Sequence, residues 1–285
     1  MKIIVTHLSP DLDAITSVWL IKKFLPGWKN AQIIFVPAGS TLDNKNPDND
    51  KDIIHVDTGM GKFDHHQTDK NICAATLVFD FLKKEKVFKK NQQDAIERIV
   101  NQINVFDHFG EINFSNPDAD HFEFLISSII DSGLKNVLKN DEEIVNCIFP
   151  ILDSLFIIFT KKIQAEKNIK NGYVFKSAWG KTLVMLSKNE DSLKLALKKG
   201  FKLVVRKDPD KGNIRIKTPP EKKYHLRPLY QKIVQVDKNA TWFLHISGNM
   251  LLNGSSKNPH FTPSKLTINQ IIDIIKSVKM LNVRS

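Results

Sequence analysis

The sequence predicts an α/β protein of two domains: a larger one with a mainly parallel sheet over residues 1–165 and a smaller, mixed α/β one over residues 172–285. Three observations lead to this prediction. Short apolar runs alternate with helical stretches in the first part of the chain, strand patterning begins again after residue 172, and the net charge changes sign between the two parts. With 285 residues, the chain is long enough for a hydrophobic core in each domain.

The N-terminal domain is expected to begin with three short strands and a helix. The runs 2–7, 31–37 and 53–56 are apolar and of strand length, and a helix is expected from residue 15 to the break at Pro26-Gly27. Strands that alternate with helices form a parallel sheet, whose ligands bind beyond the carboxyl ends of the strands.

The remaining elements are predicted from the same patterns. Helices are expected over 74–105 and 121–138, and the apolar run 144–163, which contains Pro150, predicts a kinked and buried helix that leads into a linker near 165–172. In the second domain the predicted strands are 173–176, 181–186, 201–206, 213–218 and 241–245, and the predicted helices are 191–199, 226–235 and 267–279. The strands 201–206 and 213–218 are expected to pair across a turn.

Composition excludes several classes of protein. The chain has 41% hydrophobic and 26% charged residues, and its two cysteines, Cys73 and Cys147, lie in unrelated contexts, which argues against a disulfide framework and a thiolate zinc site. The apolar N-terminus is interrupted by Asp11 and Asp13, unlike a signal peptide. No apolar run is expected to cross a bilayer. We therefore expect a cytoplasmic protein without a membrane partner.

The charge is divided unevenly along the chain. Residues 1–170 hold 20 Lys and Arg against 24 Asp and Glu, a balance of −4, whereas residues 171–285 hold 22 against 7, a balance of +15. This division suggests that the first half holds metal and the second half binds a polyanion. The alternative is that lysines simply cover solvent-facing surfaces.

Side chains that suit metal ions come after the predicted strands of the acidic half. The candidate ligands are His7, Asp11, Asp13, Asp57, His65 and Asp107, with Asp64 and His66 beside them. Clustered carboxylates repel one another unless cations neutralise them. Imidazole and carboxylate without thiolate suit Mn²⁺ or Mg²⁺, with Co²⁺ or Zn²⁺ as further options. Taken singly, Asp11 or Asp13 could instead cap the following helix, and His65 or His66 could be an ordinary polar residue.

These motifs resemble those of a known superfamily. Asp64-His65-His66 is similar to the signature triplet of the DHH phosphoesterases, and residues 7–14, His-Leu-Ser-Pro-Asp-Leu-Asp-Ala, resemble their first motif. The first motif is closest in spelling to family II inorganic pyrophosphatases. The spelling Asp-His-His-Gln is similar to the DHH-like exonuclease family once labelled metal-dependent protein hydrolases. The specific resemblance covers residues 1–110.

The resemblance implies a role for each candidate ligand. His7, Asp11 and Asp57 would hold one metal, and a second would be held by Asp13, Asp57, His65 and Asp107. In that arrangement His66 faces the substrate phosphate, Asp64 orients a histidine, and the active site lies in the cleft between the domains. The context Asp57-Thr58-Gly59 differs from the pyrophosphatase spelling, and the extra histidines His55 and His108 are interpreted as structural.

The resemblance also implies that the basic domain binds substrate through a glycine-rich motif and cationic residues. Residues 245–257 resemble that motif loosely, and the arginines of this half are candidates because their forks recognise phosphate. With His66, the predicted substrate-binding residues are Arg206, Arg215, Arg227, His245, Asn253, Gly254, Ser255 and Lys257. The alternative is a hairpin turn with an exposed lysine, and arginines that lie on the surface.

The leading hypothesis is a metal-dependent phosphoesterase, of exonuclease or nucleotide phosphatase type, that hydrolyses phosphoester bonds of short oligonucleotides or nucleotides. It would use water activated by two divalent cations, with Mn²⁺ expected and Mg²⁺ or Co²⁺ as options. One alternative is a manganese-dependent inorganic pyrophosphatase, which the first motif favours and the balance of +15 over residues 171–285 disfavours. The other alternative is a non-catalytic nucleotide-binding protein.

Overall fold

The computed structural model describes residues 1–254 and 260–279, and the chain divides into two compact units, Met1–Thr160 and Lys161–Ser285. We call them the N-terminal and C-terminal units and describe each by itself. Both are α/β, as the sequence predicts: the first contains a parallel sheet of three strands and the second a mixed sheet of six.

The sheet of the N-terminal unit brings three strand ends to one edge. Its strands are β1 (Ile3–His7), β2 (Gln32–Val36) and β3 (Ile53–His55), in the order β2-β1-β3, and both pairings are parallel. His7 pairs with Val36, and Val5 pairs with His55. The segments after β1 and β3 therefore leave the sheet at the same edge, where the predicted ligands lie.

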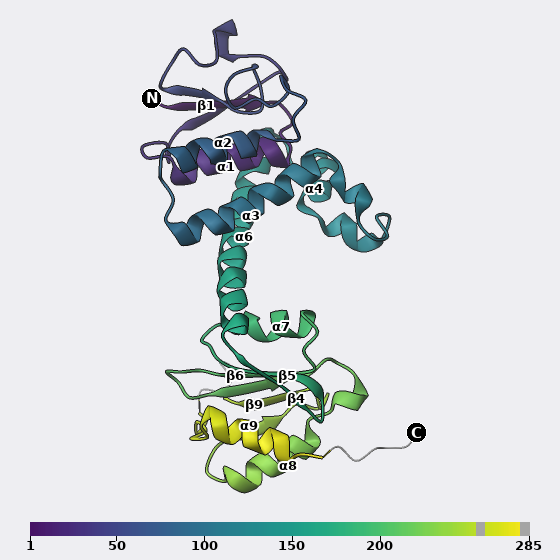
Figure 1. The fold of residues 1–285 in the computed structure, drawn as a ribbon. Coiled ribbons are helices and arrows are strands. Elements are labelled where there is room, and N and C mark those ends of the chain that lie inside the picture. Colours follow the sequence, from purple (N-terminus) through teal and green to yellow (C-terminus); the bar gives the residue numbers. More distant parts are fainter. Residues whose placement is uncertain (255–259, 280–285) are drawn as a thin grey trace. The chain divides into compact units, whose positions relative to one another are not determined.

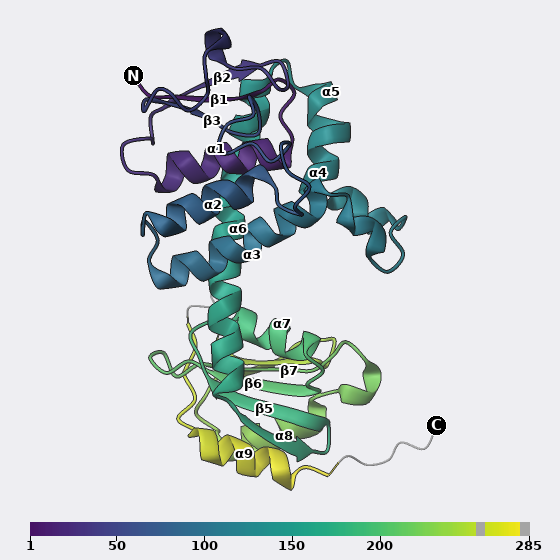
Figure 2. The ribbon, with the colours of Figure 1, turned by 45° about the horizontal axis from the view of Figure 1, so that its top comes forward.

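Helices of the N-terminal unit cover the sheet and carry most of its core. They are α1 (Leu12–Phe24), α2 (Ala74–Lys84) and α3 (Lys90–Asp107), and α1 lies beside α2 (Figures 1 and 2). Residues 12–21 of α1 are all buried, which explains why this helix lacks a clear polar face. The predicted helix over 74–105 is two helices, because the chain turns after Glu85 and Lys86 takes a left-handed φ of 55°.

Short helical segments fill the region where the sequence predicts one helix over 121–138. Two short segments lie outside this region, η1 (Leu42–Asn44) before β3 and η2 (Gly110–Asn113) after α3. The segments within it are η3 (Asp120–Phe124), α4 (Ile126–Ser128), η4 (Ile129–Leu134) and α5 (Lys135–Val137). The segment η4 has π-helical geometry. Leu138 ends this run in an extended conformation.

The long helix α6 (Asp141–Lys170) corrects two expectations. It is continuous over 30 residues, so the linker expected near 165–172 is absent and the division between the units lies inside a helix. An 18-residue window of α6 has a mean hydropathy of 1.8, so by length and composition the helix could cross a membrane, contrary to the expectation that no run is long enough. Core helices of soluble proteins pass the same test, and 22% of the window is buried.

The C-terminal unit is a six-stranded sheet with helices on both faces. Its strands are β4 (Tyr173–Ser177), β5 (Gly180–Leu186), β6 (Leu203–Lys207), β7 (Ile214–Lys217), β8 (Trp242–Leu244) and β9 (Met250–Asn253), in the order β4-β5-β6-β7-β9-β8. Among the strand pairs of the described residues, β5 and β6 are the one parallel pair. The strand β9 lies inside residues 245–257, where a glycine-rich motif is expected, and Met250–Asn253 pairs with both β7 and β8.

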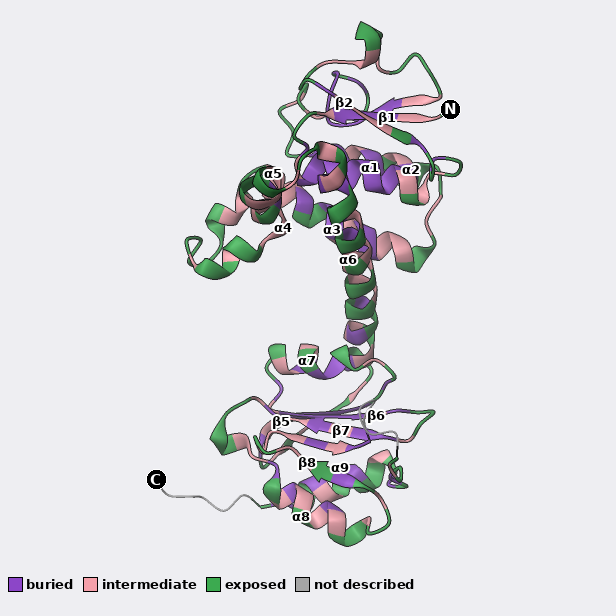
Figure 3. Cartoon of the chain, turned by 180° about the vertical axis from the view of Figure 1, so that it is seen from behind, coloured by how far each residue is buried: buried purple, intermediate pink, exposed green. Residues whose placement is uncertain are grey.

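Two separate cores hold the helices of this unit to its sheet. The helix α7 (Asp191–Lys198) packs on one face through Leu193 and Ala196. The helices α8 (Arg227–Val236) and α9 (Ile268–Ser277) pack on the other face through residues such as Ile233 and Ile275, and the short η5 (Lys222–Tyr224) precedes α8. Figure 3 shows the strands largely buried between these layers.

Candidate metal centre

The first two ligand candidates lie at the ends of parallel strands. His7 is the last residue of β1, and Asp57 lies two residues after β3. Asp57 takes a left-handed φ of 53°, a conformation that is uncommon for residues with a side chain and that collects at functional sites. His7 Nε2 lies 3.3 Å from Asp57 Oδ2, and His7 Nδ1 lies 2.9 Å from the carbonyl oxygen of Leu8.

Two more carboxylates lie at helix N-termini. Asp11 caps α1, and its Oδ1 accepts a hydrogen bond of 2.9 Å from the backbone N–H of Ala14. Asp13 is buried, and its two oxygens accept hydrogen bonds of 2.7 and 2.8 Å from Ala74 and Ala75 at the start of α2. Helix N-termini stabilise negative charge, so the fold places both carboxylates where their charge is tolerated.

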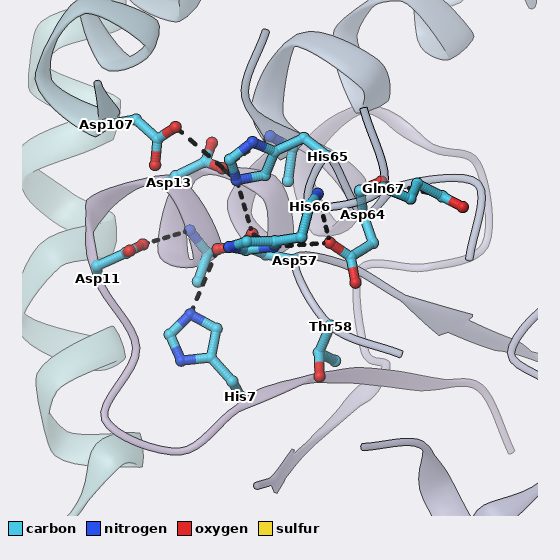
Figure 4. A network of polar contacts seen from close by, with 12 residues as sticks. His7, Asp11, Asp13, Asp57, Thr58, Asp64, His65, His66, Gln67 and Asp107 are labelled. Atoms are coloured by element: carbon cyan, nitrogen blue, oxygen red, sulfur yellow. Dashed lines mark hydrogen bonds and ion pairs between the residues drawn. The ribbon is translucent and has the colours of Figure 1, made fainter. Parts of the chain in front are cut away.

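The triplet Asp64-His65-His66 divides into a buried support, Asp64, and two rings, of which His65 is 14% exposed and His66 is 60% exposed. Asp64 is 2% exposed, and its carboxylate accepts hydrogen bonds from the backbone N–H of Met60 at 2.8 Å and of His66 at 3.1 Å. The same carboxylate lies 2.8 Å from His66 Nδ1. His65 Nε2 points instead toward other carboxylates, at 3.4 Å from Asp57 and 3.8 Å from Asp107 (Figure 4). Asp64 therefore orients His66, and His65 joins the acidic cluster.

All these side chains except Asp13 line one cavity. Its volume is about 400 Å³, and its walls are formed by His7, Asp11, Ala38, Gly39, Asp57, Met60, Asp64, His65, His66 and Asp107. Among the described residues, possible ligand atoms form three sets, each with its atoms within 4.8 Å of one another: His7, Asp11 and Asp57; Asp57, His65 and His66; and His65, Asp107 and His108. Figure 4 shows Asp57 in the middle of the group.

Protons compensate the crowded negative charge in the metal-free protein. Burial and the charge of Asp57 raise the pKa of Asp11, and burial, Asp57 and Asp107 raise the pKa of Asp13 well above its ordinary value. Burial opposes charge on His7, but its hydrogen bond to Asp57 raises its pKa to about 9.

The hydrogen bond between His65 and Asp57 likewise shifts the pKa of both groups. The hydrogen bond to Asp57 raises the pKa of His65 to about 9. Burial works against the charge of Asp57, but hydrogen bonds from His65 and His7 lower its pKa to about 2. The cluster thus binds positive charge strongly, whether as protons or as cations.

The donor set fits divalent cations. Asp57 Oδ1 is buried, and the ring nitrogens of His65 and His66 lie 3.4 and 3.8 Å from it, too far for a short hydrogen bond. Imidazole nitrogens and carboxylates surround it, and no cysteine lines the cavity. Such a set suits Mn²⁺ or Mg²⁺ better than thiolate-preferring metals.

The two extra histidines have different surroundings. The ring of His55 is 5% exposed and is bonded to the backbone of Leu42 and Pro47, as expected for a structural residue. His108 ends α3, and its Nδ1 lies 2.9 Å from the carbonyl oxygen of Asn104 and 3.3 Å from Asp107. His108 therefore lies beside the candidate ligands as well as bonding to the helix backbone, so the interpretation of His108 as structural does not cover all its contacts. Its position directly after Asp107 is the feature of the sequence that indicates this.

Several predicted substrate-binding residues of the C-terminal unit have structural roles instead. Arg206 is 1% exposed and donates to the carbonyl oxygen of Ser187 at 2.6 Å and to Asp208 at 3.4 Å. Asn253 is fully buried and donates to two backbone carbonyls, those of Thr241 at 2.9 Å and Thr262 at 3.0 Å. Neither side chain is available to a ligand, because both are buried and already donate hydrogen bonds to groups of the protein.

The other predicted residues of that unit differ in availability. Arg215 is paired with Glu190. Gly254 takes φ of +84°, and a Cβ there would lie 2.4 Å from the ring of Phe261, so its need for glycine comes from packing. Arg227 and His245 line a cavity of their own. Ser255 and Lys257 lie outside the described residues.

The family model of the ChrB C-terminal domain matches residues 4–159, which carry every candidate metal ligand. The chain belongs to this family. The ChrB match ends one residue before the boundary between the two units. No curated protein matches the sequence.

The chain is structurally similar to DHH-family proteins. RecJ of Thermus thermophilus, solved in complex with Mg²⁺, is 11% identical with a TM-score of 0.33, and the match covers 96% of this chain and 49% of RecJ. This chain thus spans about half the length of RecJ. PggH of Vibrio cholerae, a pGpG-specific phosphodiesterase, is 16% identical with a TM-score of 0.26, and the match covers 96% of this chain and 98% of PggH. An exopolyphosphatase-related protein of Bacteroides fragilis is 14% identical with a TM-score of 0.26, and the match covers 96% of this chain and 90% of that protein.

Proposed function

We propose that this chain is a metal-dependent phosphoesterase that hydrolyses phosphoester bonds of short oligonucleotides or nucleotides. The observation that carries the proposal is that Asp57 belongs to two sets of His and Asp ligand atoms in one cavity of about 400 Å³. Two-metal phosphoester hydrolysis uses two cations held close together, and a carboxylate shared by two ligand sets would bring them together.

The ligand sets define where two cations would be held. His7, Asp11 and Asp57 form one such set and would hold one cation. The other cation would be held by Asp13, Asp57, His65 and Asp107, whose carboxylates lie 4.0, 3.4 and 3.8 Å from His65 Nε2. When bound, the cations would activate water and offset the charge that develops on phosphate. The fold itself gathers these ligand atoms at one edge of the sheet.

His66 is placed to move a proton. Its side chain is 60% exposed, and Asp64 Oδ1 accepts from Nδ1 at 2.8 Å, which fixes the ring orientation and leaves Nε2 free of that hydrogen bond. In its protonated form Nε2 would donate to a phosphate oxygen or to the leaving oxygen. Asp64 supports this role without touching the substrate.

The basic C-terminal unit supports an extended anionic substrate. Residues 171–285 carry a balance of +15, more than a small anion needs, and binding of a polyanion through such charge weakens as salt rises. The spelling of the first motif favours pyrophosphate instead, so this substrate belongs in the same test. The prediction that substrate lies in a cleft between the domains stays a prediction.

The test combines metal content with substrate choice. The purified chain, stripped with a chelator and reloaded with Mn²⁺, would be assayed on short RNA, short DNA, a bis-phosphonucleotide and pyrophosphate. We expect metal-dependent turnover of the nucleic-acid or nucleotide substrates and little of pyrophosphate, and no turnover by Asp57→Asn. The exposed Asp210, paired with Lys188 in the other unit, offers Asp210→Asn as a matched control. Turnover of pyrophosphate alone would replace the proposal with a pyrophosphatase, and metal binding without any turnover would favour a binding protein.

A further inference from the structure

A second cavity lies within the C-terminal unit, away from the metal ligands in sequence. It has a volume of about 440 Å³ and is lined by His225, Arg227, Leu244, His245, Ile246, Ser247 and Gly248. These residues come from the start of α8 and from the tip of the β8–β9 hairpin.

The walls of this cavity are held in place by buried contacts. Leu226, fully buried at the start of α8, donates its backbone N–H to the carbonyl oxygen of Gly248 at 2.7 Å. A Cβ at Gly248 would lie 3.5 Å from that of His225, so the hairpin tip packs directly against the α8 side. The carbonyl oxygen of His225 accepts from the indole N–H of Trp179, which is 2% exposed. The cavity is therefore a fixed feature of the fold.

Two of the polar side chains that line the cavity, Arg227 and His245, carry N–H groups that no described residue accepts. Arg227 is exposed and makes no hydrogen bond or ion pair with any described residue, whereas Arg206 and Arg215 of the same unit are paired with carboxylates. No carboxylate lines the cavity. A free guanidinium offers five N–H groups in a planar fork that matches phosphate. An unpaired fork in a cavity without acids indicates an anionic ligand.

His245 adds a second donor. The backbone N–H of Ser247 donates to His245 Nδ1 at 3.2 Å, and the hydroxyl of Ser247 lies 2.9 Å from the same nitrogen. Because Nδ1 is the acceptor, the proton of the neutral ring is on Nε2, which has no hydrogen-bond partner among the described residues. Arg227 and His245 thus supply donors from two different elements.

Apolar side chains beside the donors indicate the kind of anion. Ile246 is 98% exposed at the hairpin tip, and Phe243 is 56% exposed with its ring 6.4 Å from that of His245, nearly at right angles. Exposed rings next to cationic groups are how proteins bind single-stranded nucleic acid, whose bases contact the apolar groups while the phosphates contact the cations. Inorganic phosphate would use the donors alone.

We propose that this cavity is a phosphate-binding site for single-stranded oligonucleotides, formed by Arg227 and His245 and separate in sequence and unit from the metal ligands. The choice of an oligonucleotide as occupant rests on the proposed function. Phe243 and Ile246 lie where a neighbouring base would contact the protein. The site gives the basic unit a specific phosphate contact in addition to its general positive charge.

The test measures binding without metal, so that it does not depend on catalysis. The full chain is titrated into a short fluorescent single-stranded oligonucleotide in the presence of a chelator, and anisotropy is followed at several salt concentrations. We expect Arg227→Gln to weaken binding about tenfold and to reduce the salt slope by about 0.7, the value for one lost phosphate contact. Arg227→Lys keeps the charge without the fork, so it should restore the salt slope but only part of the affinity.

Lys238→Gln is the matched control, because Lys238 is an exposed cation of the same unit that does not line the cavity. An equal loss of affinity in Lys238→Gln would show a general charge effect and overturn the site, as would unchanged binding by Arg227→Gln. Inorganic phosphate is titrated as a competitor: if Arg227→Gln loses competition by phosphate but keeps its oligonucleotide affinity, the oligonucleotide assignment is wrong.

Hydrolysis of a small chromogenic phosphodiester by the Mn²⁺-loaded wild type is measured alongside. Hydrolysis with no effect of Arg227→Gln on oligonucleotide binding overturns this inference and leaves the proposed function standing. Loss of binding in Arg227→Gln with no hydrolysis by the wild type supports the site and overturns the proposed function.

Discussion

Asp11 offers a direct test of whether a helix cap is also a metal ligand. Its Oδ1 accepts from the N–H of Ala14 at 2.9 Å, and its carboxylate forms a possible ligand set with His7 and Asp57. Burial and the charge of Asp57 raise the pKa of Asp11, so its negative charge is unfavourable in the metal-free protein. A pair of substitutions, Asp11→Asn and Asp11→Ala, separates the two roles.

The two substitutions should differ in stability and agree in metal binding. Asparagine caps a helix about as well as aspartate and carries no charge, so the chelated Asp11→Asn protein should be at least as stable as wild type. Asp11→Ala loses the cap and about 1 kcal/mol of unfolding free energy. Groups that merely support a metal ligand change affinity by about 10- to 100-fold, so loss of a direct ligand should weaken Mn²⁺ binding at least about 100-fold, or about 2.7 kcal/mol, in both variants.

Denaturant unfolding with a chelator gives the stabilities, and calorimetric titration of Mn²⁺ gives the affinities. Thr267→Ala serves as control, because Thr267 caps α9 in the other unit through a 3.2 Å hydrogen bond from the N–H of Gln270. It should cost stability like Asp11→Ala and leave Mn²⁺ binding unchanged. Wild-type Mn²⁺ affinity and turnover in Asp11→Asn would refute the ligand role and leave Asp11 as a cap alone.

Three further predictions concern other parts of the chain. Asp57→Asn should remove bound metal from both ligand sets, and elemental analysis that finds the wild-type metal content would contradict the shared-ligand argument. Gly254→Ala forces a Cβ to within 2.4 Å of the Phe261 ring at φ of +84°, so it should lower stability by about 1–3 kcal/mol, and an unchanged thermal transition would disprove the clash. Asp208→Ala should cost about 1.5–3 kcal/mol at neutral pH. Burial opposes the Asp208 charge, but backbone N–H groups and Arg206 hold its pKa below 3.8, so its contribution is present above pH 3.8 and is lost as pH falls through the folded pKa. Denaturant unfolding at neutral and acidic pH should show the cost shrinking in acid, and a constant difference would contradict this.

The sheet edge of the N-terminal unit could be predicted from sequence because it depends on local patterns. The three apolar runs are each close to the length of a strand, and parallel pairing brings the loops at their carboxyl ends together. His7 and Asp57 come to the same cavity for this reason. The backbone detail that completes the geometry, the left-handed φ of Asp57, has no signal in the sequence, because aspartate is compatible with both this conformation and ordinary ones.

The end of α6 differs from the prediction because polar residues resemble a linker in the sequence. Ala165 and Ile169 lie four positions apart, on one face of the continuing helix, and both are buried. Ile169 belongs to the core that includes Leu183 and Leu193 of the following sheet and helix. The apolar face of the helix thus continues past residue 165, with too few apolar residues to stand out among the lysines and asparagines.

Which arginines are free could not be predicted, because pairing depends on contacts between distant segments. Arg206 and Arg215 lie opposite each other on β6 and β7, and both approach Glu190, which precedes α7. Arg227 begins a helix, and no described acid approaches it. The three are equivalent by residue type and local charge, and only the strand register separates the two structural arginines from the one available to a ligand.

This distinction changes what the positive charge of residues 171–285 implies. Internal pairs such as Arg215–Glu190 and Lys188–Asp210 contribute nothing to the balance of +15, which therefore reflects cations in excess of the acids. That excess predicts how steeply binding depends on salt, but any distribution of lysines over the surface would give a similar slope. A contact with one phosphate needs a free fork in a fixed place. Among the described arginines of the C-terminal unit, Arg227 alone meets that condition. The salt dependence of binding therefore measures the charge of the whole surface, whereas the affinity lost in Arg227→Gln measures the contribution of this one site.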